Sequence, residues 1–250
     1  MAVGHVRVGT GPRRVIALHG WFGAADQWGP FADLIDPARF SYAFLDCRGY
    51  GSRRTETGAY TMAEISADAL ALADALDWPR FSLVGHSMGG MAVQRVYADA
   101  PDRVDRLVGI SPVSASGFPF DEDGWALFDG AAADPAKRRQ IIDLTTGGRL
   151  SDYWLDQMVE SSTRTSDPAA FGAYLTAWGR TDFADEIKGA AVPALAVAGE
   201  HDPALGPAWI ADTWCQHYPQ AASAVLTDAG HYGMFEAPVR LAGLLEQFLD

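Results

Sequence analysis

The chain has 250 residues, of which 48% are hydrophobic and 20% charged, a balance typical of one sizeable globular domain. Its formal net charge of −13 at pH 7 disfavours nucleic acid and anionic membrane surfaces as partners. No run of about 18 apolar residues predicts a membrane span. We also see no signal-peptide pattern, and the cysteines Cys47 and Cys215 lack metal-ligand spacing, so we expect free thiols and a cytoplasmic location.

Short apolar runs alternate with helical patterns in the amino-terminal part of the chain. We predict an edge strand at residues 3–8 and further strands at 14–18, 40–45, 81–84 and 106–110. Helices are predicted near 29–35, 61–76 and 88–98, and the second begins with a capping box, Thr61 with Glu64 three residues later. This alternation predicts an α/β fold with a doubly wound, mostly parallel sheet and helices on both faces.

The pattern changes between residues 112 and 190, where no strand-like run occurs. Helical segments are predicted instead near 135–146, 151–161 and 168–178, with many aromatic residues among them. The alternation then resumes with strands at 193–198 and 222–226 and helices near 208–217 and 238–249. We therefore expect a core of residues 1–111 and 191–250, and a helical cap of residues 112–190 inserted after the strand that ends near Ile110.

The most informative stretch is residues 81–97, FSLVGHSMGGMAVQRVY, which predicts a strand, a sharp turn and a helix. Gly85 and Gly89 flank Ser87, as a strained turn with close backbone neighbours requires. Such a turn lifts the serine hydroxyl clear of the sheet and directs the first amides of the helix at whatever the serine attacks. Because serine is a poor nucleophile unaided, this reading requires a base and an oxyanion site elsewhere.

Two later loops supply candidate partners for Ser87. The sequence GEHDP, which contains Asp202, follows one predicted strand, and DAGHY, which contains His231, follows the next. The carboxyl ends of parallel strands face the crevice where ligands bind in open sheets. The chain order serine, aspartate, histidine therefore allows an imidazole to stand between a hydroxyl and a carboxylate. The other histidines are scattered without ligand spacing, so no metal site is expected.

Taken together, these stretches resemble the α/β-hydrolase superfamily over essentially the whole chain. HGWFG looks like its oxyanion loop, DCRGYGSR the loop after the next strand, GHSMGG the nucleophile elbow, GEHDP the acid turn and AGHYGMFEAP the histidine loop. The resemblance implies that Ser87 is the nucleophile, His231 the general base and later acid, and Asp202 the group that orients the imidazole. The helical insertion after RLVGIS is similar to the family's cap domain.

The resemblance also implies an oxyanion hole and a reaction. The hole would use the backbone amides of Trp21 and Met88, with Phe22 as the alternative to Trp21. The expected enzyme is a serine hydrolase without a cofactor that cleaves a small-to-medium hydrophobic carboxylic ester or lactone through an acyl-enzyme on Ser87. Amide hydrolysis, carbon–carbon bond hydrolysis and perhydrolysis by the same groups stay open, as does a non-catalytic ligand-binding member of the fold.

Aromatic residues are the candidates for a substrate pocket. We expect Trp21, Phe22, Trp125, Trp154 and Trp178 to line it, although a helical lid also needs aromatic residues for its own core. The expected partner is a small-molecule substrate, and the sequence predicts no oligomeric state. Of the remaining polar residues, His19 is expected to brace its loop by hydrogen bonding, and Asp46 and Arg48 are expected to form a loop-bracing pair.

Overall fold

The computed structural model describes residues 3–250, which form a seven-stranded sheet in the order β1-β3-β2-β4-β5-β6-β7. The strands are β1 (His5–Val8), β2 (Arg13–Leu18), β3 (Phe40–Leu45), β4 (Phe81–His86), β5 (Val104–Ile110), β6 (Ala194–Gly199) and β7 (Ala222–Leu226). The edge strand β1 runs antiparallel to β3, and the other neighbours are parallel. The expected mostly parallel, doubly wound sheet is confirmed.

The helices before β6 are η1 (Gly29–Leu34), η2 (Gly51–Arg53), α1 (Met62–Ala75), α2 (Met88–Asp99), η3 (Pro101–Arg103), α3 (Glu122–Gly130), α4 (Pro135–Thr145), α5 (Asp152–Thr165), α6 (Pro168–Arg180) and α7 (Ala184–Ile187). After β6 come α8 (Pro207–Asp212), α9 (Trp214–His217), α10 (Gly233–Glu236) and α11 (Pro238–Leu249). The helices labelled η are 3-10 helices.

Several elements begin and end where the sequence predicts them, among them β3, β7 and α11. The capping box of α1 forms only in part. The Thr61 hydroxyl accepts a hydrogen bond from the Glu64 amide at 3.1 Å, as expected. The Glu64 carboxylate, however, accepts from the amides of Ala59 and Tyr60. The helices α3 and α10 are short and were not predicted.

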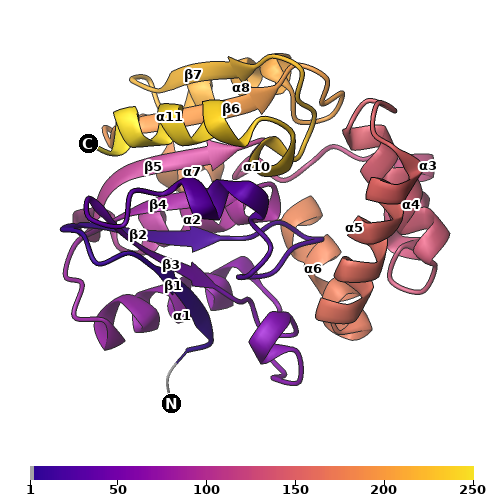
Figure 1. Ribbon diagram of the computed structural model, residues 1–250, viewed down its shortest axis with the longest axis horizontal. Helices are drawn as coiled ribbons and strands as arrows, with labels where there is room; N and C mark the ends of the chain where they lie inside the picture. The colour runs from indigo at the N-terminus through magenta and orange to yellow at the C-terminus, as the bar shows by residue number, and fades with distance from the viewer. Residues whose placement is uncertain (1–2) are drawn as a thin grey trace.

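The helices cover both faces of the sheet. The carboxyl-terminal helix α11 packs beside η1 on one face, and α1 and α2 pack against each other on the other face (Figure 1). The sheet itself supplies much of the core, since every residue of β3, β4 and β6 is buried. Because both faces of these strands are buried, their sequences are nearly continuous apolar runs, which is typical of central parallel strands.

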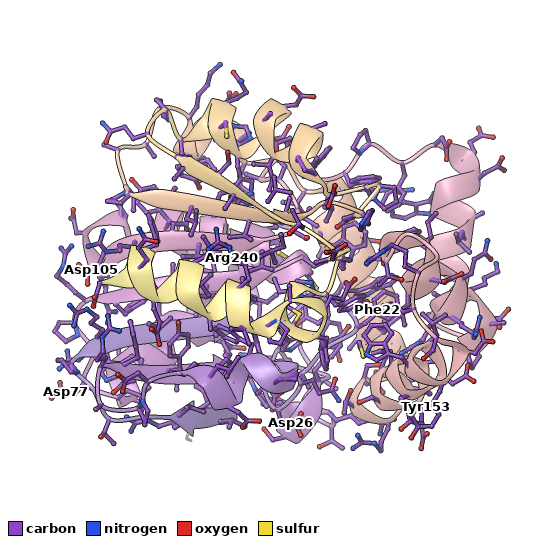
Figure 2. The ribbon with its side chains drawn as sticks, turned by 45° about the horizontal axis from the view of Figure 1, so that its top comes forward. Phe22, Asp26, Asp77, Asp105, Tyr153 and Arg240 are labelled. Atoms are coloured by element: carbon purple, nitrogen blue, oxygen red, sulfur yellow. The ribbon has the colours of Figure 1, made fainter. Side chains whose placement is uncertain are left out.

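Residues 112–190, between β5 and β6, are called the insertion here. Its helices α3 to α6 gather beyond the carboxyl ends of strands such as β2 and β5 (Figure 1). Figure 2 shows Phe22 at the junction between the sheet and these helices, whereas Tyr153, which is 75% exposed, lies on the outer side. The insertion therefore covers the carboxyl ends of the parallel strands, where ligands bind in open α/β sheets.

Candidate active site

Ser87 lies at the turn between β4 and α2 in a strained backbone conformation, with φ 54° and ψ −117°. Residues other than glycine rarely adopt such a positive φ, and the conformation persists only where neighbouring structure holds it. Here the Ser87 amide donates to the Ile110 carbonyl at 3.0 Å, and the Ser87 carbonyl accepts from the Val113 amide at 3.0 Å. The end of β5 thus fixes the turn from both sides of the serine.

The two glycines of the turn are required by close backbone contacts. A Cβ on Gly85 would lie 2.2 Å from the Gly89 carbonyl oxygen, and a Cβ on Gly89 would lie 2.1 Å from the Leu18 carbonyl oxygen. Any larger residue would push β4, α2 and β2 apart. The tight turn therefore depends on glycine at both positions, for the reason expected from the sequence.

The second part of the site is a buried carboxylate–imidazole pair. Asp202 follows β6 and is 4% exposed, and its Oδ2 accepts a hydrogen bond of 2.6 Å from His231 Nδ1. Its other oxygen, Oδ1, accepts from the amides of Ala204 and Leu205, each at 3.0 Å. Because an ionised carboxylate only accepts, Nδ1 carries the hydrogen, and Nε2 is the nitrogen that remains free to take a proton.

The balance of forces on Asp202 favours its ionised form. Burial alone would raise its pKa, but the attraction and hydrogen bond of His231, with the amides of Leu205 and Ala204, outweigh burial and hold the pKa below its ordinary value. A carboxylate that stays ionised at this position can orient the imidazole and stabilise it when it becomes charged.

Ser87 and His231 line the same cavity, an apolar space of about 40 Å³ beneath the insertion. We call it the apolar cavity. Its walls are mostly phenyl and aliphatic side chains, among them Val113, Phe118, Phe120, Phe128, Ile141 and Leu205. The structure thus brings Ser87, His231 and, through its hydrogen bond, Asp202 to one place, although the three residues lie far apart in the sequence.

The backbone amides proposed for an oxyanion hole are available. Within residues 3–250, neither the Met88 amide nor the Trp21 amide donates a hydrogen bond to another group. The Phe22 amide is also without an acceptor in this part of the chain, so the choice between Trp21 and Phe22 stays a prediction. Met88 is the first residue of α2, and its unpaired amide is one of those that every helix amino terminus presents.

The candidate aromatic residues are divided among three places. Trp21, Phe22 and Trp178 line the apolar cavity. Trp125 lies instead in a surface hollow, where the Arg180 guanidinium sits 3.6 Å from the centroid of its ring. Trp154 lines a separate, larger pocket. The expectation that all five line one pocket with Ser87 is therefore corrected for Trp125 and Trp154.

The residues of the apolar cavity that were not predicted from the sequence include Phe118, Phe120, Phe128 and Ile141. The first two come from the segment GFPF, which leads from β5 into α3, and their alternate spacing was an available signal. The positions of Phe128 and Ile141 depend on how α3 and α4 pack on the core, which no local pattern specifies.

His19 braces its loop by hydrogen bonding, as expected. Its Nδ1 donates to the Gly20 carbonyl at 2.8 Å, and its Nε2 accepts from the Cys47 amide at 3.1 Å. These two bonds define a neutral imidazole, and burial lowers the pKa of His19 in agreement with that state. The side chain links the loop after β2 to the loop after β3.

The expected pair of Asp46 and Arg48 does not form. Asp46 accepts hydrogen bonds from the amides of Ala25 at 2.7 Å and Ser52 at 2.9 Å, so it does brace two loops. Arg48 reaches α1 instead, where it pairs with Asp68 at 2.9 Å. The predicted pair is wrong because the Asp46 carboxylate accepts from amides of the neighbouring loops, whereas the Arg48 guanidinium donates to Asp68 of α1.

Two further side chains hold the histidine loop. His86, 6% exposed, donates from Nε2 to the His231 carbonyl at 2.9 Å, and burial, with His231 nearby, lowers its pKa to about 3. Glu236, which the sequence analysis missed, accepts from the Gly230 amide at 2.7 Å and the Tyr232 amide at 3.0 Å. The only available signal was its place in the segment AGHYGMFEAP.

In the part of the chain that the structure describes, no group of three or more histidine, cysteine, aspartate or glutamate side chains is placed to hold a metal ion. Nor does any helix among residues 3–250 have the length and apolar character needed to cross a membrane.

The fold and the arrangement around Ser87 can be compared with known proteins. The family model described as alpha/beta hydrolase fold matches residues 13–238. Esterase YbfF of Escherichia coli (strain K12) is 27% identical over 246 residues, which cover 94% of this chain and 92% of that protein. A non-heme chloroperoxidase of Streptomyces lividans is 31% identical over 216 residues, which cover 77% of this chain and 76% of the other.

Among solved structures, a bromoperoxidase from Bacillus anthracis superposes with a TM-score of 0.88 over 98% of this chain and 94% of the other, at 20% identity. At that identity the likeness shows the fold alone. The family model covers most of the chain, so the chain belongs to the alpha/beta hydrolase fold family. Its relatives include proteins named as an esterase, a non-heme chloroperoxidase and a hydrolase of 2-hydroxy-6-oxononadienedioate, which supports a hydrolase acting on small molecules.

Proposed function

We propose that the protein is a serine hydrolase that cleaves a carboxylic ester or lactone with a short acyl group through an acyl-enzyme on Ser87. The observation that carries this proposal is the 2.6 Å hydrogen bond between buried Asp202 and His231, with His231 lining the same cavity as Ser87. A buried carboxylate bonded to an imidazole, and an imidazole that lines the same cavity as a strained serine, are the parts that acyl transfer needs.

The hydrogen bond to Asp202 leaves His231 Nε2 to act as the base. In the first step Nε2 takes the Ser87 proton while Oγ attacks the ester carbonyl carbon. The carbon–oxygen bond to the alcohol then breaks, and the alcohol leaves with the proton from His231. In the second step water attacks the acyl-enzyme, gives its proton to His231, and the acid is released as Ser87 regains its proton.

The amides of Met88 and Trp21 are proposed to bind the negatively charged oxygen that develops during both attacks. Neither amide has an acceptor among residues 3–250, which supports this role. Loss of one such donor typically costs about 3 kcal/mol of transition-state stabilisation. Because the donors are backbone amides fixed by the elbow and by the braced loop of His19, little reorganisation is needed when the charge appears.

The size and lining of the apolar cavity support a short acyl group. A volume of about 40 Å³ is small, because a single water already requires about 10–15 Å³. The walls of phenyl and aliphatic side chains match a methyl or ethyl group better than a charged one. We propose that the insertion acts as a lid over this cavity, since α3, α4 and α6 supply Phe128, Ile141 and Trp178 to its walls.

Hydrolysis of p-nitrophenyl acetate tests the proposed function. The wild-type protein is expected to turn this ester over, and Ser87→Ala is expected to reduce kcat by at least about a thousandfold. The control is Ser116→Ala, because Ser116 is an exposed serine that does not line the cavity. Equal activity of the two variants would contradict the role of Ser87.

Perhydrolysis is a second candidate because two relatives are named as non-heme chloroperoxidases. The same acyl-enzyme would then be attacked by hydrogen peroxide in place of water, giving a peracid. Supplying acetate with hydrogen peroxide and measuring peracetic acid distinguishes the two reactions. Ester hydrolysis without peracid formation would leave only the first candidate.

A further inference from the structure

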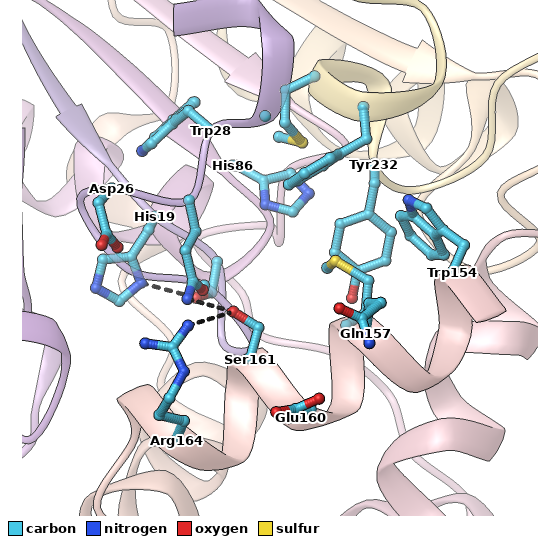
Figure 3. A pocket seen from close by; sticks show the side chains of 17 residues that line it. His19, Asp26, Trp28, His86, Trp154, Gln157, Glu160, Ser161, Arg164 and Tyr232 are labelled. Atoms are coloured by element: carbon cyan, nitrogen blue, oxygen red, sulfur yellow. Dashed lines mark hydrogen bonds between the residues drawn. The ribbon is translucent and has the colours of Figure 1, made fainter.

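A second pocket, of about 470 Å³, lies between the loop that leads into η1, helix α5 and the segment around α10 (Figure 3). We call it the polar pocket, and its lining residues include Asp26, His86, Trp154, Gln157, Glu160 and Tyr232. Tyr232 lines the apolar cavity as well. Gly20 also lines the polar pocket, and a Cβ at Gly20 would lie only 3.2 Å from Ser87 Cβ. The serine therefore lies at the boundary between the two spaces.

Two buried polar side chains of the polar pocket have unused hydrogen-bonding capacity. His86 Nε2 is bonded to the His231 carbonyl, so Nδ1 of this neutral ring is an acceptor, and no donor reaches it within residues 3–250. The Tyr232 side chain is 4% exposed, and its hydroxyl has no hydrogen-bond partner among the same residues. Burial raises the pKa of Tyr232, which leaves the hydroxyl protonated and able to donate.

Neither His86 Nδ1 nor the Tyr232 hydroxyl belongs to the fully buried unpaired side-chain atoms of residues 3–250, so both can be reached from the pocket, and a ligand there can form hydrogen bonds with them. Figure 3 shows the Tyr232 phenol pointing toward α5, with Gln157 beside it and Trp154 close by. Gln157 adds an amide that can both donate and accept. The polar pocket thus offers an acceptor and a hydroxyl from the buried residues His86 and Tyr232, and an amide from the exposed residue Gln157.

The charges of the pocket favour a neutral ligand. Its ionised side chains Asp26, Glu160 and Arg164 carry both signs and are exposed to solvent, whereas the buried groups are neutral. A charged ligand would need a buried opposite charge to offset its desolvation. Hydroxyl groups, by contrast, donate and accept in turn and fit this neutral set of partners.

An aromatic wall completes the pocket. The rings of Trp154 and Tyr232 lie 5.7 Å apart, and those of Trp154 and Phe235 lie 6.0 Å apart, between centroids. Aromatic side chains offer a large apolar face next to polar tips. Such a wall suits the carbon–hydrogen face of a polyol or a sugar, whose hydroxyls point to the pocket's polar groups.

We propose that the polar pocket binds the polyhydroxylated alcohol part of the substrate, of the size of glycerol or a monosaccharide, while the apolar cavity holds the short acyl group. The inference rests on the proposed function, because the ester bond must lie at Ser87 between the two spaces. When the carbon–oxygen bond breaks, the alcohol oxygen takes its proton from His231, and the polyol remains in the polar pocket until it is released.

Two acetate esters that differ only in their alcohol test this inference. The ratio of kcat/KM for 6-O-acetylglucose to that for ethyl acetate is expected to be about tenfold or more in the wild type, as two additional hydrogen bonds would give. Gln157→Leu and Tyr232→Phe are each expected to lower this ratio about fivefold, the effect of one lost hydrogen bond. Gln216→Leu is the matched control, because Gln216 lies exposed on α9 and should leave the ratio unchanged.

A ratio near one in the wild type, or a higher kcat/KM for acetylcholine than for the sugar ester, would overturn the inference. Calorimetric titration of Ser87→Ala with glucose provides a readout that does not depend on turnover. Binding that Gln157→Leu weakens supports the polar pocket even if no ester is hydrolysed, in which case the proposed function alone fails. Hydrolysis of ethyl acetate without glucose binding overturns the polyol inference and leaves the proposed function standing.

Discussion

The backbone amide of His231 donates a hydrogen bond of 3.1 Å to the carbonyl oxygen of Thr145, the last residue of α4. This bond joins the histidine loop of the core to the insertion. Thr145 also lines the apolar cavity. The position of His231 therefore depends on the insertion as well as on Asp202, so movement of α4 would displace both the cavity wall and the proposed base.

Gly230→Ala tests this dependence. A Cβ at Gly230 would lie 2.7 Å from Thr146 Cα and 3.0 Å from the Thr145 carbonyl oxygen, so the substitution must push α4 away from the histidine loop. We expect kcat for p-nitrophenyl acetate to fall at least about tenfold and the free energy of unfolding to fall by about 1–3 kcal/mol. Steady-state kinetics and urea unfolding measure the two effects.

Gly243→Ala is the matched control, because nothing lies within 4 Å of a Cβ at this position of α11. It is expected to leave kcat unchanged and to stabilise the protein by about 0.5–1 kcal/mol, since alanine favours a helix interior over glycine. Equal behaviour of the two variants would contradict the proposed link between α4 and His231.

Asp202→Asn is expected to reduce kcat about 10³- to 10⁴-fold with the fold retained. The asparagine oxygen can still accept from the amides of Ala204 and Leu205, but its amide group would then face His231 and favour the wrong tautomer. Stopped-flow or steady-state ester hydrolysis measures the loss. Asp228→Asn serves as control, because Asp228 makes its hydrogen bonds through its backbone and lies exposed near His231 in the sequence. A comparable loss in both variants would argue against a specific role for Asp202.

Stability is expected to depend on pH through His86. Its pKa in the folded protein is about 3, whereas that of an unfolded histidine is about 6.5. Between these values the unfolded chain binds a proton that the folded protein excludes, so the free energy of unfolding falls as the pH falls, by up to about 1.4 kcal/mol per pH unit. Between pH 7 and pH 5 the loss from this residue is about 2 kcal/mol.

His86→Gln removes the titrating group while keeping a donor for the His231 carbonyl. Urea unfolding at pH 7 and pH 5 should therefore show a smaller loss of stability in this variant than in the wild type. The pKa of His19 is also lowered by burial, but His19 is present in both proteins and contributes in the same direction to each. The same loss in both proteins would contradict the account of His86.

The elements that carry strong local signals were predictable. The alternation of apolar runs and helical patterns indicated the parallel sheet, and the glycines around Ser87 indicated the elbow because the contacts of Gly85 and Gly89 involve neighbouring backbone. Asp202 and His231 could be proposed because each lies in a loop that follows a strand of the sheet, β6 and β7 respectively.

The walls of the site were less predictable because they depend on how the insertion packs. Trp125 and Phe128 lie three residues apart on α3, yet Phe128 lines the apolar cavity and Trp125 stacks against Arg180. The ring of Phe128 lies 4.8 Å from that of Phe120, a neighbour from the preceding loop. Such contacts join segments whose relative positions no local pattern specifies.

This difference within α3 gives a prediction about acyl-chain length. Phe128→Ala removes part of the cavity wall, so the ratio of kcat/KM for p-nitrophenyl octanoate to that for the acetate is expected to rise about tenfold, because more apolar surface of the longer chain is buried. Trp125→Ala, an aromatic truncation on the same helix outside the cavity, should leave the ratio unchanged. An equal rise in both variants would show that general loosening of the insertion, and not the cavity wall, sets the preference.

The central claim, that Ser87 is the nucleophile of this fold, is tested most directly by mass spectrometry of the protein treated with a fluorophosphonate. We predict one adduct per chain, located on the peptide that contains Ser87, and none in Ser87→Ala. An enzyme that hydrolyses p-nitrophenyl acetate but takes up no label at Ser87, or a Ser87→Ala variant labelled as fully as the wild type, would contradict it.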